Sequence, residues 1–86
     1  MKSKFDNSMT IKKLPSLSAR QVVKILKEIG FYEDRQKGSH LILFNLKTNR
    51  RTVVPMHAGK PIKKTLLKSI IEKDAGISIE EFLKHL

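Results

Sequence analysis

Apolar residues recur every three or four positions in the first third of the chain. This spacing places them on one side of a helix and leaves charged residues on the other. Ser18 precedes the stripe, Gln21 stands three residues later as a capping box requires, and Gly30 follows it. The pattern predicts a helix over residues 19–29 whose buried side comprises Ala19, Val22, Val23, Ile25, Leu26 and Ile29.

Three short runs with strand character follow, at 31–36, 39–46 and 51–56. The middle run alternates Leu41 and Leu43 with Ile42 and Phe44, so both faces of this strand are partly apolar. Gly38 marks the first turn, and the residues at 47–50 are typical of a hairpin turn with an asparagine suited to positive φ. Consecutive strands joined by tight turns predict an antiparallel meander with the middle run at its centre.

A second helical stripe occupies the last third of the chain. It includes Leu66, Leu67, Ile70 and Ile71, with Lys63, Lys64 and Lys68 predicted to point outward and Gly76 to end it. Ser78 then predicts the cap of a short last helix, with Glu81 as its capping-box partner. The order predicts an α+β fold, α-β-β-β-α, with a three-stranded antiparallel sheet, helices packed on one face and the other face open. This is the order of the double-stranded-RNA-binding domain, although a fold alone does not set a function.

The length of 86 residues is that of one small domain with a modest core. Residues 1–12 are polar and aperiodic, so we predict a flexible extension followed by a single domain over 13–86. The absence of cysteine excludes disulfides and thiolate metal sites. The N-terminus lacks the long apolar run of a secretory signal or a membrane span, and a cytoplasmic protein is expected.

The charge balance points to a polyanionic partner. Eighteen Lys and Arg residues oppose 8 Asp and Glu, which gives a formal net charge of +10. Such a field favours nucleic acid, an acidic membrane surface or an acidic protein. A lysine-rich solvated surface is the plain alternative. We favour nucleic acid because the cations cluster around identifiable structural positions.

His40 is the strongest candidate for chemistry. It stands at the start of the middle strand, after Arg35, Lys37, Gly38 and Ser39. An imidazole suits proton transfer near neutral pH, and RNA supplies its own nucleophile in the 2′-hydroxyl, so cleavage needs neither metal nor cofactor. The arginine and lysine suit phosphate oxygens, the glycine permits close backbone approach, and the serine offers a donor. Alternatively, His40 is a strand histidine satisfied by a neighbour, or a simple phosphate contact.

Other polar residues are weaker candidates. Lys60, Lys63 and Lys64 surround the start of the second long helix, where they form either a phosphate cradle or an ordinary solvated face. His57 is a general acid, an RNA-orienting group or, more simply, a loop histidine bound to backbone. His85 is expected only to favour the helix dipole. Three histidines without ligand spacing do not predict a metal site.

Arginines at the second turn and the few aromatic residues allow further predictions. Arg50 and Arg51 are placed at the hairpin tip, where they track RNA, meet acidic residues of a partner or are simply solvated. The phenylalanines are predicted mostly to be core, and Tyr32 stands alone, so no aromatic ladder for single strands is evident.

The order of these blocks resembles the HicA (YcfA-like) family of toxin mRNA interferases. The resemblance covers Leu14 to Leu86, with Lys64 standing where the family often has glycine. No single block is decisive, and Gly-Ser-His by itself is weak, but the blocks together in this order are specific. They are Leu14-Pro15, Ile29-Gly30-Phe31, Arg35 to His40, Val53 to Lys60, Leu66 and Ala75 to Leu83.

The resemblance implies a ribosome-independent endoribonuclease with His40 as its single catalytic histidine and no metal or cofactor. It implies RNA as the substrate and a HicB-type antitoxin as the protein that inhibits it. The RNA-binding residues are then expected among Arg35, Lys37, Gly38, Ser39, His57, Lys60, Lys63 and Lys64. The alternative is a noncatalytic RNA-binding module of the same fold. A DNA-binding regulator is less favoured because no helix-turn-helix is evident.

Overall fold

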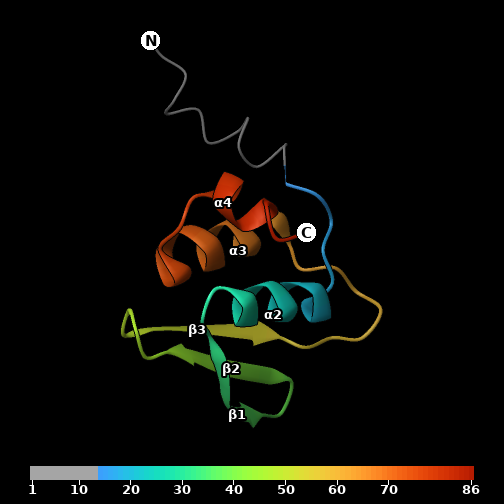
Figure 1. Ribbon diagram of the computed structural model, residues 1–86. Helices are drawn as coiled ribbons and strands as arrows, with labels where there is room; N and C mark the ends of the chain where they lie inside the picture. The colour runs from blue at the N-terminus through green and yellow to red at the C-terminus, as the bar shows by residue number, and fades with distance from the viewer. Residues whose placement is uncertain (1–13) are drawn as a thin grey trace.

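A layer of strands lies beneath a layer of helices in the computed structural model, which describes residues 14–86 (Figure 1). The predicted extension over residues 1–12 lies outside this range. None of the helices in the described range has the length and apolar character needed to cross a membrane. The elements are α2 (Ala19–Glu28), β1 (Tyr32–Lys37), β2 (His40–Asn45), β3 (Arg50–Pro55), α3 (Lys64–Ser69), the π-helical segment η2 (Ile70–Ala75) and α4 (Ile79–Leu83).

Helix α2 begins as the sequence predicts. The Ser18 hydroxyl accepts from the Gln21 backbone N–H at 3.2 Å, and the Gln21 side chain accepts from the Ser18 N–H at 2.9 Å. Both halves of the capping box are therefore made, which satisfies two of the free donors at this end. The helix ends one residue before the predicted boundary, because Ile29 is its C-cap.

The sheet confirms the predicted antiparallel meander, in the order β1-β2-β3. Strand boundaries differ from the predicted ones by a residue at each end. Leu41 and Leu43 of β2 are buried on the face that the helices cover, whereas Ile42 and Phe44 lie on the open face. Asn49 has a φ of 58°, so the asparagine in the second turn takes the left-handed conformation that the sequence predicted.

Strand β1 carries an extra residue. Arg35 pairs with Ile42 and Glu33 with Leu43, which leaves Asp34 between them without a partner of its own. A β-bulge of this kind resets the alternation of side chains along the strand. As a result, Tyr32 and Arg35 face the same side of the sheet although an odd number of positions separates them. Regular alternation would have placed them on opposite faces.

The second long helix is α3 continued by η2. Leu67, Ile70 and Ile71 are buried as predicted, but Leu66 is 39% exposed and does not belong to the core stripe. The π-helical turn was not predicted, since its wider winding leaves no distinct sequence signal. The core that these elements share comprises Leu14, Leu17, Ala19, Val22, Val23, Ile25, Leu26, Phe31, Leu41, Leu43, Val54, Ile62, Leu67, Ile70, Ile71, Ala75, Ile79 and Phe82.

The C-terminal helix differs from prediction in two contacts. Ser78 caps α4 by accepting from the Glu81 N–H at 3.0 Å, but the Glu81 carboxylate lies 3.8 Å from the Lys84 ammonium and does not return to the cap. His85 was predicted to favour the helix dipole and no more. Its Nδ1 lies 3.1 Å from Oε1 of Glu28, so it joins the chain end to α2.

Polar contacts fix β3 against η2. Thr52 is 2% exposed, and its hydroxyl donates to Asp74 Oδ2 at 2.8 Å. Arg50 donates from Nη1 to the Lys73 carbonyl at 3.1 Å. The three predicted roles of Arg50, which were tracking RNA, meeting an acidic partner or being solvated, did not include this contact: the exposed guanidinium also closes the end of a helix.

Candidate functional site

His40 is the first residue of the central strand, and its side chain is exposed on the open face. Two residues lie opposite it, Lys37 on β1 and Pro55 on β3. Opposed residues in an antiparallel pair bring their Cβ atoms to about 5 Å, so the Lys37 side chain starts beside the imidazole. Within residues 14–86, the His40 side chain has no hydrogen-bond partner. The imidazole is therefore free to meet a ligand.

A tight hairpin holds His40 next to the cations. Lys37 and His40 pair across the two turn residues, and Gly38 adopts a φ of 56°. Positive φ at the first turn position is what such short hairpins need, which accounts for glycine there. The Gln36 side chain braces the turn by donating to the Gly38 carbonyl at 3.0 Å. Arg35 faces Ile42 on the same side, so both predicted cations of β1 share the face of His40.

The loop after β3 lies against the same hairpin. The Met56 N–H donates to the Ser39 carbonyl at 2.6 Å, so His57 follows a residue that is fixed to the turn before His40. Lys60 donates its N–H to the His57 carbonyl at 3.2 Å, which closes a tight turn through Gly59. The loop is then held at its far end, where the Ile62 N–H donates to Leu17 O at 2.8 Å.

This loop lines a hollow of about 330 Å³ that gathers several of the predicted residues. His57, Lys60 and Lys63 line it together with Pro55, the cross-strand neighbour of His40. Lys64 does not line it and stands exposed as the first residue of α3. Lys63 is the exposed N-cap residue of that helix, so its ammonium lies beside the free N–H groups of the first turn.

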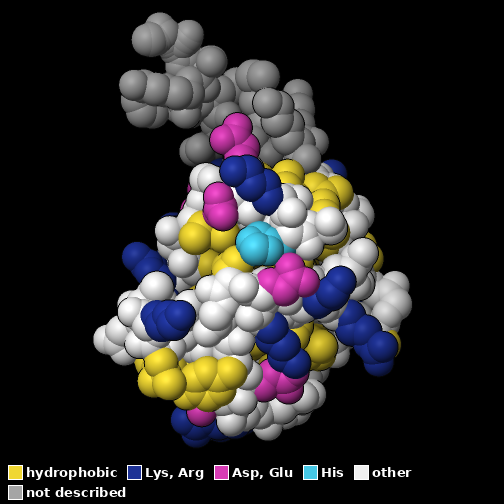
Figure 2. Space-filling model, viewed as in Figure 1, with side chains coloured by type: hydrophobic (Ala, Val, Ile, Leu, Met, Phe, Trp, Pro, Cys, Tyr) yellow, Lys and Arg dark blue, Asp and Glu magenta, His cyan; other side chains and the backbone are white. Residues whose placement is uncertain are grey.

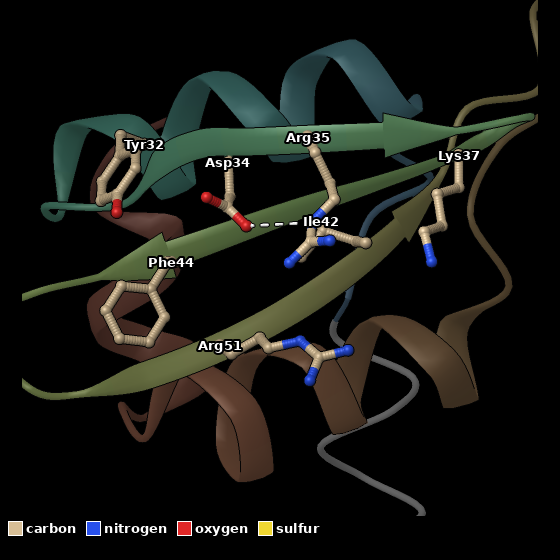
Figure 3. Close-up of a pocket in the computed structure, with 7 residues that line it drawn as sticks. All are labelled: Tyr32, Asp34, Arg35, Lys37, Ile42, Phe44 and Arg51. Carbon is tan, nitrogen blue, oxygen red and sulfur yellow. Dashed lines mark hydrogen bonds and ion pairs between the residues drawn. The ribbon is translucent and has the colours of Figure 1, made fainter.

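A second hollow, of about 450 Å³, lies on the open face of the sheet beside Arg35 and Lys37 (Figure 3). Arg51 of β3 joins them, and Arg35 extends from β1 across Ile42. Asp34 is the single acid in the lining and pairs with Arg35 at 3.3 Å. An exposed pair of this kind has little net energy, so it leaves the guanidinium available.

Two aromatic rings at one end of this hollow were missed by the sequence reasoning. Tyr32 and Phe44 pair edge to face, with ring centroids 6.2 Å apart and an interplanar angle of 79°. Phe31 and Phe82 are buried in line with the prediction that the phenylalanines are mostly core, whereas Phe44 is only partly buried and lies on the open face. The alternation of β2 already placed Phe44 on the open face. Nothing in the sequence indicated the bulge in β1, which places Tyr32 on the same face as Phe44.

The site as a whole is a histidine set between two groups of cations. Lys37, Arg35 and Arg51 lie on its sheet side, and the hollow with His57, Lys60 and Lys63 lies on its loop side. Basic side chains also spread over the face of the molecule in Figure 2, with acidic ones between them and an apolar patch over the strand layer. An exposed imidazole flanked by cations is an arrangement that suits acid–base chemistry on a nucleic acid.

Fold and site together define a small basic α+β protein with an exposed histidine on the open face of its sheet. The family model described as the HicA toxin of bacterial toxin–antitoxin systems matches residues 19–77. The chain therefore belongs to the HicA toxin family. Members of this family are generally ribonucleases, and membership implies an antitoxin partner. Comparison with curated proteins gave no match.

Proposed function

We propose that this toxin is a ribosome-independent mRNA interferase that cuts RNA without a metal ion, with His40 as its catalytic residue. The observation that carries the proposal is the position of His40: exposed at the start of the central strand, opposite Lys37 and next to the loop that contains His57. The hairpin positions the side chain, and within residues 14–86 no hydrogen bond occupies its imidazole, which leaves both ring nitrogens accessible for proton transfer.

The reaction follows from the groups present. His40 takes the proton of a ribose 2′-hydroxyl, and the 2′-oxygen attacks the adjacent phosphorus. The bond to the 5′-oxygen of the next nucleotide breaks, and that oxygen takes a proton from His57 or from water. The products are a 2′,3′-cyclic phosphate and a 5′-hydroxyl. Lys37 and Arg35 stabilise the negative charge on the phosphate, where donors placed in advance contribute most.

The remaining residues hold the RNA. Gly38 and Ser39 bring backbone and a hydroxyl close to the phosphate chain, and His57, Lys60 and Lys63 extend the positive surface around the loop. Lys64 lies further along the start of α3, where it meets a more distant phosphate. These contacts are electrostatic, so RNA affinity is expected to fall steeply with salt.

The test is RNA cleavage by the purified protein in EDTA, without ribosomes, followed by detection of cyclic phosphate ends. His40→Ala is expected to lower cleavage by about 10²–10⁴-fold, the range of one general acid–base group, with the fold intact. His85→Gln is the matched control: it removes an imidazole that contacts Glu28, away from the hairpin, and is expected to cleave normally.

Other results would revise the proposal. Undiminished cleavage by a folded His40→Ala protein would exclude the catalytic assignment. RNA binding without cleavage by the unaltered protein would favour the noncatalytic RNA-binding module. Cleavage abolished by EDTA and restored by a divalent ion would overturn metal independence.

We propose further that a HicB-type antitoxin inhibits the toxin by covering His40. The dense positive charge around the hairpin suits an acidic partner surface. Diethyl pyrocarbonate modification of the three histidines, read by mass spectrometry, is expected to show His40 protected in the complex and His85 unchanged. Equal modification of His40 with and without the antitoxin would contradict steric inhibition.

A further inference from the structure

We infer that the hollow on the open face of the sheet is a stacking subsite for a base of single-stranded RNA, formed by Tyr32 and Phe44. The inference deepens the proposed function and rests on it for the identity of the ligand. Tyr32 is 43% exposed although it is aromatic, and Phe44 beside it is only partly buried. Both rings face outward from a sheet that no element of residues 14–86 covers on this side (Figures 1 and 3).

The surroundings of the rings favour a nucleic acid. Arg35, Lys37 and Arg51 line the same hollow, against one acid, Asp34. Single-stranded nucleic acids bind where cations follow the phosphate chain and aromatic faces receive the bases. Sheets with exposed aromatics use this arrangement, because unpaired bases lie flat against the strands. A purely apolar partner would bury three cations against a single acid, which is costly.

The geometry links the subsite to His40. Phe44 and His40 lie on the same strand and the same face, four residues apart, which corresponds to about 13 Å along the strand. Ile42 lies between them, with Arg35 opposite it on β1. A short single-stranded segment therefore runs from the histidine over Ile42 to the rings, with arginines beside its phosphates. Duplex RNA cannot use this path because its bases are paired and stacked.

The chain offers a direct probe of this subsite. Tyr32 is its only tyrosine and it has no tryptophan, so intrinsic emission reports on the hollow alone. In the His40→Ala protein, which binds without cleaving, a mixed-sequence single-stranded RNA is expected to quench this emission after inner-filter correction. Duplex RNA and polyphosphate of equal charge are expected to bind through cations and leave the emission nearly unchanged.

Variants separate stacking from charge. Phe44→Leu keeps apolar volume but removes the ring, and it is expected to weaken single-strand binding about fivefold or more while changing duplex binding by less than about twofold. Tyr32→Leu is expected to give the same pattern when binding is measured by the anisotropy of labelled RNA. Because Tyr32 is more exposed than Phe44, this variant is less prone to a folding defect. Lys84→Gln is the charge control, since this lysine follows α4 on the helical side of the molecule.

The outcomes are distinct from those of the cleavage assay. RNA cleavage by the unaltered protein with no tyrosine response, and with Phe44→Leu binding normally, overturns the subsite and leaves the ribonuclease intact. A tyrosine response without cleavage by the unaltered protein supports the subsite and removes the catalytic proposal instead. No response to RNA but quenching by the purified antitoxin also overturns the inference, since the hollow then belongs to the protein partner.

Discussion

Gly76 is a residue whose backbone conformation disfavours a side chain, and a side chain there would also displace the end of Arg50. Its φ is 73°, and a Cβ placed there would lie 2.5 Å from Cζ of Arg50. The guanidinium that closes η2 therefore occupies the space that a side chain would need. The sequence reasoning correctly placed a helix end at this glycine. It did not foresee that an arginine 26 positions earlier packs against it, because such pairing depends on the tertiary arrangement.

Gly76→Ala is expected to destabilise the protein by about 1–3 kcal/mol, from backbone strain and displacement of Arg50. Urea unfolding followed by circular dichroism measures it. Gly59→Ala is the matched control, because its φ is 79° but nothing lies within 4 Å of its Cβ position. If both variants lose the same stability, the Arg50 contact contributes nothing.

At the scale of elements, the spacing of apolar residues and the capping residues predicted the order of the helices and strands and the strand boundaries to within a residue. The capping box at Ser18 and the burial of alternate residues Leu41 and Leu43 depend on local sequence, so they could be predicted. The bulge at Asp34 and the π-helical turn are not. Both depend on how an element must adjust to its neighbours, and neither changes composition in a recognisable way. The cationic side of the site was therefore predictable, whereas the place of Tyr32 in it was not.

The contact between β3 and η2 provides a test at this scale. Thr52→Val is expected to cost about 1–3 kcal/mol, because the partly buried Asp74 carboxylate loses its donor. Thermal or urea unfolding measures the loss. Thr48→Val, in the exposed second turn, is the control and is expected to change stability by less than about 0.5 kcal/mol. A neutral Thr52→Val would mean that water replaces the hydroxyl without loss.

For the molecule as a whole, the net charge of +10 matters through its distribution. Cations flank His40 on both the sheet side and the loop side, and this arrangement supports binding along a phosphate chain rather than at a single point. The sequence predicted the excess charge and the residues that carry it. It could not show that Lys63 lines the loop hollow while Lys64 stands apart, since the two are adjacent in the chain.

Replacing both Lys63 and Lys64 by glutamine is expected to weaken single-stranded RNA binding and to reduce the slope of log Kd against log salt by about 1.4, at roughly 0.7 for each phosphate contact. Titrations at several salt concentrations measure this. Lys73→Gln with Lys84→Gln removes the same charge from η2 and the end of α4. An equal loss of slope in this control would indicate general charge attraction rather than contacts at α3.

The bulge in β1 also bears on how this chain tolerates changes in length. Asp34 has no cross-strand partner, so a chain lacking it pairs Glu33 and Arg35 in unbroken register and keeps Tyr32 opposite Phe44. Loss of Glu33 or Arg35 instead moves Asp34 into the vacated paired position and so changes which side chain faces Leu43 or Ile42. In an alignment of relatives, a single-residue gap is therefore expected at Asp34 more often than at the neighbouring positions. Such a gap would indicate relatives whose first strand lacks the bulge.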